Sequence, residues 1–163
     1  AIEEKIETLF WMGGSLDGHG NVVDPCFDGT AEWNAFWDPE AVKRVWDSSL
    51  EIHMVGLEST EELPLTRELC QHWAELRRYP AIDLIGQGYA LVLNVAANNV
   101  YCLHPEIAEV ERVRCDVRVD GAAAGRTFRC DEGREVTLVT HADPKRFYTL
   151  VDELAMSAAP ALY

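Results

Sequence analysis

The chain has 163 residues, of which 48% are hydrophobic and 26% charged, and its formal net charge is −14. This composition is typical of a folded globular protein with its own core and excludes a disordered chain. The negative charge and the lack of any Lys/Arg cluster argue against nucleic acid as a partner. No apolar stretch is long enough to cross a membrane, and no signal peptide is recognisable, so we expect no membrane partner either.

The five cysteines have no short paired spacing, so the sequence predicts neither a disulfide framework nor a Cys-x-x-Cys zinc site. We expect mostly buried free thiols in a reducing, cytoplasmic protein. The five histidines are scattered, and a zinc site on His19 and Cys26 would lack a second pair of ligands. The chain begins at Ala1, in what reads as a helix end, which hints at truncation or processing.

Strands and helices are expected to alternate in the first half of the chain. Apolar runs predict strands at residues 9–12 and 52–56. Asp38-Pro39 predicts a helix start, with the aspartate as N-cap and the proline in the first turn. A further helix is expected to follow residue 66, with its apolar residues on one face. The side chains expected in the core are Trp37, Trp46, Cys70 and Trp73.

Residues 81–93 are expected to be partly helical, and an apolar segment continues from 94 to 103. From Val113 apolar and charged residues alternate, which predicts a half-exposed strand. The chain is then expected to return at 126–130, form a third strand at 135–141 and end in a helix that starts at Asp143-Pro144. The sequence therefore predicts a mixed α/β fold, in which buried strands alternate with helices and a small antiparallel meander follows. Neither a phosphate-binding glycine loop nor a Ser/His/Asp triad is recognisable.

Residues 20–39 combine side chains that suit a polyhydroxylated ligand with a flat ring. Amides and a carboxylate can hydrogen-bond hydroxyl groups, and an indole can lie against a ring. The segment follows an apolar run that stops at Gly13-Gly14. A strand end, a glycine-rich loop and a helix start together are typical of ligand sites in α/β proteins. The side chains concerned are Asn21, Glu32, Trp33, Asn34 and Trp37.

The order and spacing of these residues resemble the nucleoside hydrolase family, the inosine-uridine type of N-ribohydrolase. The resemblance covers nearly all of the chain, but only about the second half of the family's domain. Trp33 is most similar to the purine-preferring branch, because most other members have phenylalanine there. The motifs that carry the resemblance are Met12-Gly13-Gly14, Gly20-Asn21, Thr30-Ala31-Glu32-Trp33-Asn34, Trp37-Asp38-Pro39, the segment 54–60 and His104-Pro105-Glu106.

The resemblance implies hydrolysis of the N-glycosidic bond of a purine nucleoside. It places Asn21, Glu32 and Asn34 on the family's ribose-binding positions, with Trp33 beside them. It also implies Ca²⁺, held largely by an N-terminal aspartate cluster, Asp-x-Asp-x-x-x-Asp-Asp, which supplies the general base. That cluster does not occur in this sequence. We therefore expect residues 1–163 to form a single, partial nucleoside hydrolase-like domain, and we name no catalytic residue.

A later family motif, Trp-Asp-x-x, supplies a calcium ligand and an indole that stacks on the base. In the corresponding region, residues 89–101, the aspartate is absent, and Asn94 or Val95 lies nearest to its position. An asparagine oxygen can bind calcium but brings no charge, so the affinity should be lower. Asn94 is thus a candidate metal ligand, and the alternative is a helix residue satisfied by its neighbours. The family's loop before this motif is shortened or lost.

Two functions are compatible with these residues. In the first, the chain is part of a purine nucleoside hydrolase that acts on a nucleoside, together with an N-terminal-half chain or as a homo-oligomer. Alternatively, it is a catalytically inactive binding or structural module. The candidate residues also have plain structural interpretations: Asn21 could serve a turn, and Glu32 and Asn34 could be solvated loop residues. The chain alone is expected not to hydrolyse inosine.

Overall fold

The computed structural model describes residues 2–157, and for residues 87–96 only the backbone. The chain divides into two compact units. The first, called here the sheet unit, comprises Ala1–Ser59 and Glu109–His141. The second, the helical unit, comprises Thr60–Ala108 and Ala142–Tyr163. The interpretation of the chain as a single partial domain stays a prediction.

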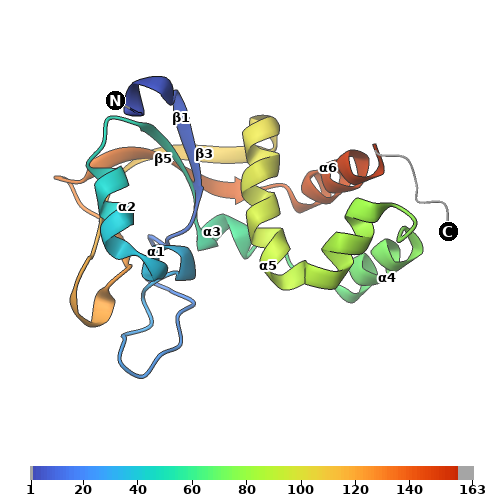
Figure 1. Ribbon diagram of the computed structural model, residues 1–163, viewed down its shortest axis with the longest axis horizontal. Coiled ribbons are helices and arrows are strands. Elements are labelled where there is room, and N and C mark those ends of the chain that lie inside the picture. Colours follow the sequence, from blue (N-terminus) through green and yellow to red (C-terminus); the bar gives the residue numbers. More distant parts are fainter. Residues whose placement is uncertain (1, 158–163) are drawn as a thin grey trace. The chain divides into compact units, whose positions relative to one another are not determined.

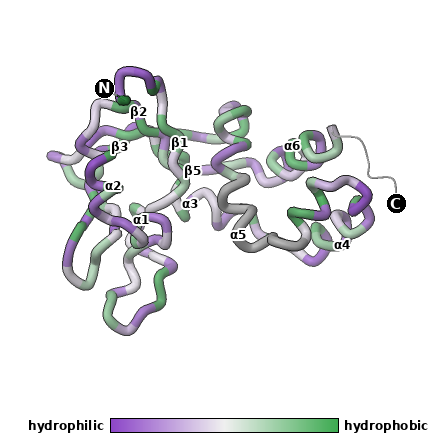
Figure 2. The backbone as a smooth tube through the Cα atoms, viewed as in Figure 1, coloured by the Kyte–Doolittle hydropathy of each residue, from purple (hydrophilic) through white to green (hydrophobic). Residues whose placement is uncertain are grey.

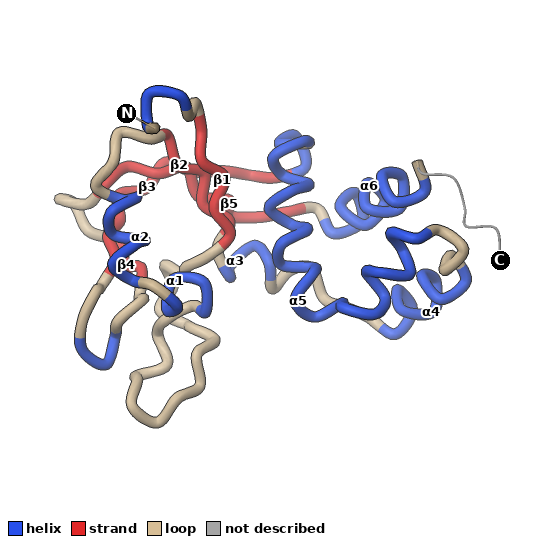
Figure 3. Tube along the Cα trace, viewed as in Figure 1, coloured by secondary structure: helices blue, strands red, loops and turns tan. Residues whose placement is uncertain are grey.

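A five-stranded sheet is the centre of the sheet unit, with the strand order β1-β2-β5-β3-β4 (Figures 1 and 3). β1 and β2 are parallel, β2 and β5 are parallel, and β3 and β4 are antiparallel. The predicted mixed α/β class is confirmed. The last three strands do not form the expected antiparallel meander, because β5 lies between β2 and β3 rather than beside β4. The sequence pattern does not reveal this insertion. The strands are β1 (Thr8–Met12), β2 (Glu51–Val55), β3 (Ala108–Val117), β4 (Thr127–Arg129) and β5 (Arg134–Ala142).

The core of the sheet unit forms where apolar side chains of three strands meet one helix. β2 buries Ile52, Met54 and Val55, whereas β3 buries alternate residues from Val113 onward. Helix α2 adds Trp46, which is 3% exposed and donates from Nε1 to Cys115 O at 3.2 Å. The buried residues of this cluster are Trp46, Ile52, Met54, Val113, Cys115, Val117, Val136 and Leu138.

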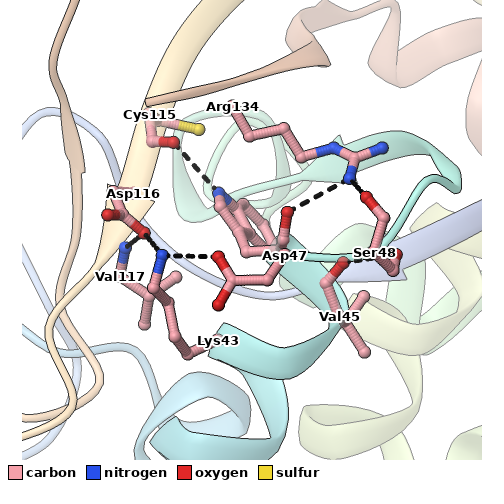
Figure 4. A network of polar contacts seen from close by, with 9 residues as sticks. Lys43, Val45, Asp47, Ser48, Cys115, Asp116, Val117 and Arg134 are labelled. Atoms are coloured by element: carbon pink, nitrogen blue, oxygen red, sulfur yellow. Dashed lines mark hydrogen bonds and ion pairs between the residues drawn. The ribbon is translucent and has the colours of Figure 1, made fainter. Parts of the chain in front are cut away.

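Polar contacts attach the C-terminal end of α2 to the sheet (Figure 4). Lys43 Nζ lies 2.7 Å from Oδ1 of Asp47, the C-cap residue of α2, and 2.8 Å from Asp116 Oδ1 on β3. Arg134 at the start of β5 donates to the carbonyl oxygen of Ser48. Because the Lys43 side chain is about one-third exposed, each ion pair is expected to contribute no more than about 1 kcal/mol. These contacts fix the direction of α2 rather than supply most of the stability.

Helix α2 of the sheet unit begins where the sequence predicts. Asp38 caps α2, since its Oδ1 accepts the N–H of Ala41 at 2.9 Å. The proline that follows occupies the first turn, where its missing N–H costs nothing. The helices of this unit are η1 (Glu3–Lys5), α1 (Trp33–Trp37), α2 (Pro39–Trp46), α3 (Leu57–Thr60, whose last residue belongs to the helical unit) and η3 (Gly121–Ala123).

The helical unit is built on contacts of α5 with α4 and α6. Trp73 on α4 is 2% exposed, and its Nε1 donates to Asp152 Oδ1 on α6 at 2.9 Å. Hydrophobic and hydrophilic residues alternate along α4 and α6 (Figure 2), and α6 buries Phe147, Leu150 and Val151. Residues 81–103, predicted as two segments, belong to one helix. The helices are α4 (Arg67–Glu75), α5 (Pro80–Leu103), η2 (Pro105–Ile107) and α6 (Pro144–Met156).

Two expectations about burial are wrong. Trp37 is 75% exposed, whereas Trp46 and Trp73 are buried as predicted. The five-residue α1 ends at Trp37 and leaves its indole outside the core. Cys70 is also exposed, together with Cys26 and Cys102, so the thiols are not mostly buried. Within the described residues, no helix is long and apolar enough to pass through a bilayer.

The thiols provide a direct test of this burial pattern. Cys115 is fully buried, and burial raises the pKa of its thiol to about 11. We expect the exposed Cys26, Cys70 and Cys102 to react rapidly with Ellman's reagent under native conditions, and Cys115 only after unfolding. Cys26→Ser should remove one rapid equivalent, whereas Cys115→Ser should remove none. Loss of a rapid equivalent in Cys115→Ser would contradict the placement of β3 in the core.

Candidate functional site

The parallel pairing of β1 and β2 brings the segments that follow them to one edge of the sheet. Met12 and Val55, the last residues of the two strands, are register partners. The N–H of Gly13 then donates to Val55 O at 3.0 Å. Carboxyl edges of parallel strands are the usual location of ligands in α/β folds. The structure brings the four predicted substrate residues, Asn21, Glu32, Trp33 and Asn34, together at the start of α1, beside this edge.

Glu32 is the centre of this group. It is 2% exposed, and its Oε2 accepts the backbone N–H groups of Gly14 at 2.9 Å, Asn34 at 2.9 Å and Ala35 at 3.2 Å. The bonds to Asn34 and Ala35 cap α1, and the bond to Gly14 attaches the loop after β1 to the helix. A solvated loop position, the structural alternative for Glu32, is therefore wrong.

The two carboxylate oxygens of Glu32 have different surroundings. Oε2 holds the fold, whereas Oε1 receives no hydrogen bond from the residues that the structure describes. Burial raises the pKa of Glu32, because the charged form loses hydration, and the N–H groups of Asn34, Gly14 and Ala35 act in the opposite direction. Glu32 thus retains one acceptor atom that a ligand could use.

Asn21 and Asn34 divide their hydrogen-bonding groups in the same way. Asn21 Oδ1 accepts the N–H of Trp33 at 2.9 Å, which leaves its Nδ2 as a donor. This bond reaches twelve residues along the chain, so Asn21 does more than serve a local turn. Asn34 Nδ2 donates to Met12 O at 3.2 Å and lies 3.0 Å from Met12 Sδ, which leaves Oδ1 as an acceptor. The N–H and carbonyl partners determine both amide orientations.

Trp33 lies in a partly exposed cluster of aromatic rings on and near α1. Its ring centroid is 5.5 Å from that of Phe36, edge on, and 5.7 Å from that of Trp37. Phe36 in turn contacts Phe27 at 4.7 Å. Because Trp33 is still 40% exposed, part of its indole is available to a flat ligand next to Asn34.

Close packing explains two glycines in this region. Gly14 has φ +75°, and a Cβ there would lie 2.6 Å from Met54 Cε and 2.7 Å from Thr127 Oγ1. A Cβ on Gly20 would lie 2.2 Å from the carbonyl oxygen of Ala31. Both positions require glycine, because any side chain would push the loop away from its neighbours.

Thr127 on β4 holds the same loop in place, a role that the sequence analysis did not identify. Its Oγ1 accepts the N–H of Ser15 at 2.8 Å and donates to Ser15 O at 2.9 Å. Both Thr127 and Ser15 are 1% exposed. One hydroxyl therefore satisfies both backbone groups of a buried residue that directly follows Gly14.

Glu58 on α3 is a second carboxylate at this edge that the sequence analysis did not single out. Its Oε1 accepts the N–H groups of Leu16 and Asp17. Its Oε2 is buried and has no hydrogen-bond partner within the described residues. The available signal was its position three residues after β2, because the carboxyl ends of parallel strands meet at one edge.

The described residues do not fit a calcium site. Among them, no three His, Cys, Asp or Glu side chains come together in an arrangement that could hold a metal ion, and calcium requires six or more oxygen ligands. Asn94, the predicted ligand, belongs to α5 in the helical unit, and its side chain lies outside the described residues. The metal assignment of Asn94 thus stays a prediction.

The model of the family described as "Inosine-uridine preferring nucleoside hydrolase" matches residues 1–149. The chain belongs to this nucleoside hydrolase family. It is 41% identical to the structure of an inosine-uridine preferring nucleoside hydrolase from Bacillus anthracis, with a TM-score of 0.90 over 96% of this chain and 54% of that one. A purine-preferring ribonucleoside hydrolase from Gardnerella vaginalis, 24% identical with a TM-score of 0.73, shares the fold.

Among the curated nucleoside hydrolases, the pyrimidine-specific ribonucleoside hydrolase RihB of Escherichia coli (strain K12 / DH10B) is 29% identical over 147 residues, which cover 81% of this chain and 44% of that protein. The chain spans about half the length of the curated relatives it matches. Membership of the family, predicted from the motifs, is confirmed. A particular similarity to the purine-preferring branch of the family, predicted from Trp33, is not confirmed.

Proposed function

We propose that this nucleoside hydrolase chain binds the ribose of a ribonucleoside whose N-glycosidic bond is hydrolysed. One observation carries the proposal. Asn21, Glu32 and Asn34 each use one polar atom to hold the start of α1 and keep another without a partner in the described chain. The atoms without a partner therefore remain available to a ligand. Together they offer one donor and two acceptors, which suits the hydroxyl groups of a sugar.

Cleavage of an N-glycosidic bond forms a ribosyl centre with oxocarbenium character and requires an attacking water. In the proposed complex, Glu32 Oε1 and Asn34 Oδ1 accept ribose hydroxyl protons, and Asn21 Nδ2 donates to a hydroxyl oxygen. Their anchors on α1 fix the sugar before the reaction, which lowers the entropic part of the barrier. In its ionised form, Glu32 also places negative charge near the developing positive ring.

The described residues do not themselves provide for the activation of water. We propose that the carboxylates for a Ca²⁺ ion come from an N-terminal half, on a second chain or a longer form of this one, and that Asn94 adds an oxygen. The 163-residue chain alone is then expected to bind nucleosides without hydrolysing them. The alternative function is a catalytically inactive binding module. The observation on its side is that the described residues hold no carboxylate cluster.

A preference for purines is the finer part of the proposal, and it rests on Trp33. An indole offers more contact area than a phenyl ring to a two-ring base. The name of RihB, by contrast, specifies pyrimidines for that protein. Titration of this chain with inosine and with uridine distinguishes a purine preference from a pyrimidine preference, since a purine site should bind inosine more tightly.

Asn21→Asp tests the ribose site directly. The aspartate retains the acceptor for the N–H of Trp33 but replaces the free donor by a charged acceptor, so nucleoside binding should weaken at least about tenfold. The measurement is isothermal titration of inosine and of free ribose into both chains. Asn99→Asp, an exposed change on α5, is the matched control and should bind like the parent. Equal binding by Asn21→Asp and the parent would contradict the proposal.

A further inference from the structure

Two arginines of the sheet unit lie opposite each other directly beyond the paired ends of β3 and β4. Arg118 N–H donates to Arg126 O at 2.9 Å, and Gly125 N–H donates to Arg118 O at 2.8 Å. These bonds continue the antiparallel pairing beyond Val117 and Thr127. Arg118 and Arg126 are therefore direct cross-strand neighbours. Like charges in this arrangement repel each other and lower stability unless something of opposite charge lies between them.

A pocket with a cavity volume of about 360 Å³ opens at this pair. Arg118, Arg126 and Arg129 provide three positive charges in a chain whose net charge is −14. The Arg118 guanidinium lies over the ring of Phe128, 4.9 Å from its centroid, so one wall is apolar. The lining residues are Leu16, Arg118, Arg126, Phe128 and Arg129.

The carboxylates near the pocket do not neutralise all three arginine charges. Arg129 Nη2 is paired with Glu111 Oε1 at 2.5 Å. Asp28 interacts electrostatically with Arg126, but it is exposed, and its Oδ1 is bonded to Thr30. Arg126 Nε is buried and has no hydrogen-bond partner in the part of the chain that the structure describes. A buried N–H of a charged group without an acceptor is costly.

We propose that this pocket binds a phosphate group, carried by a small phosphate monoester. Among the described residues, no carboxylate is hydrogen-bonded to the guanidinium groups of Arg118 and Arg126. A phosphate dianion matches these two groups in charge and in the number of acceptor oxygens. The phosphate provides the missing acceptor for Arg126 Nε and removes the repulsion across the strands. The cavity is larger than phosphate alone, and Leu16 and Phe128 provide an apolar surface for the organic part of the ester.

The first measurement is isothermal titration of the 163-residue chain with inorganic phosphate and with phenyl phosphate, at constant ionic strength set with sodium chloride. We expect binding of both, with phenyl phosphate the tighter. Arg126→Met should weaken binding at least about tenfold, because it removes a charge and the donor. Arg44→Gln, an exposed charge removal on α2, should change the affinity less than twofold. Equal losses in the two variants would indicate non-specific attraction and overturn the proposal.

Thermal unfolding adds a test that does not depend on tight binding. In phosphate-free buffer Arg126→Met should have a higher Tm than the parent, because the buried Nε and the like-charge pair are gone. Added phosphate should raise the Tm of the parent and not that of Arg126→Met. A lower Tm for Arg126→Met without phosphate would contradict the proposal. So would tighter binding of a polyglutamate peptide than of phosphate, since the pocket would then fit an acidic protein segment.

Discussion

Replacement of Glu32 by alanine is expected to lower the free energy of unfolding by about 2–4 kcal/mol, whereas Glu32→Gln should change it by less than about 1 kcal/mol. Alanine leaves the N–H groups of Gly14, Asn34 and Ala35 without their acceptor. Glutamine preserves it, because three N–H donors orient its amide oxygen into the position of Oε2. Urea denaturation of the three chains measures the difference. Equal stability of Glu32→Ala and the parent would show that the cap is unimportant.

The same glutamine should abolish most nucleoside binding. Its NH₂ group takes the position of Oε1, so the acceptor proposed for a ribose hydroxyl becomes a donor. We expect the affinity for inosine to fall at least about tenfold, at nearly unchanged stability. Glu40→Gln, an exposed change of the same kind at the start of α2, serves as control. Unchanged inosine binding by Glu32→Gln would contradict the assignment of Glu32 to the ribose site.

The pH dependence of stability follows from the direction of the pKa shift. Burial raises the pKa of Glu32 in the folded chain above its ordinary value of 4.5, so the folded state binds the proton more tightly than the unfolded state. The resulting stabilisation is fully present below the unfolded pKa and is lost as the pH rises through the folded pKa. Glu32→Gln does not titrate, and its stability relative to the parent should therefore increase with pH over this range.

Local signals in the sequence predicted most of the elements. Asp38-Pro39 and Asp143-Pro144 begin helices because each aspartate accepts backbone N–H groups of the first turn. The alternation from Val113 predicted a strand with one buried face, as β3 shows. The motif around Glu32 indicated the family, and the structure brings its polar residues together.

Features that depend on distant pairing could not be predicted in this way. The position of β5 beside β2 depends on which strand edges meet, and no local pattern encodes that choice. Trp37 has the size and hydrophobicity of a core residue, but the end of α1 leaves it exposed. The opposition of Arg118 and Arg126 follows from the register of β3 and β4. Glu58 carries no distinguishing local signal, because a single carboxylate in a helix is usually solvated.

Thr127→Val is the second substitution with a large expected effect. Valine has nearly the same shape, but it leaves the N–H and the carbonyl oxygen of buried Ser15 without their partner. At about 1–3 kcal/mol for each unsatisfied group, the free energy of unfolding should fall by about 2–5 kcal/mol. Thr140→Val on β5 is the control. It removes a single hydrogen bond, to Glu109 O at 3.2 Å, which is exposed, and should lower the free energy of unfolding by less than about 1 kcal/mol.

The substitution should also weaken nucleoside binding, although Thr127 is not among the residues proposed to touch the ligand. Ser15 follows Gly14, whose N–H is one of the three that orient Glu32, so release of Ser15 loosens the carboxylate that accepts the ribose hydroxyl. Inosine titration of Thr127→Val and Thr140→Val at a temperature where both are folded separates the two effects. Lower stability with undiminished binding in Thr127→Val would mean that the loop stabilises the sheet without positioning Glu32.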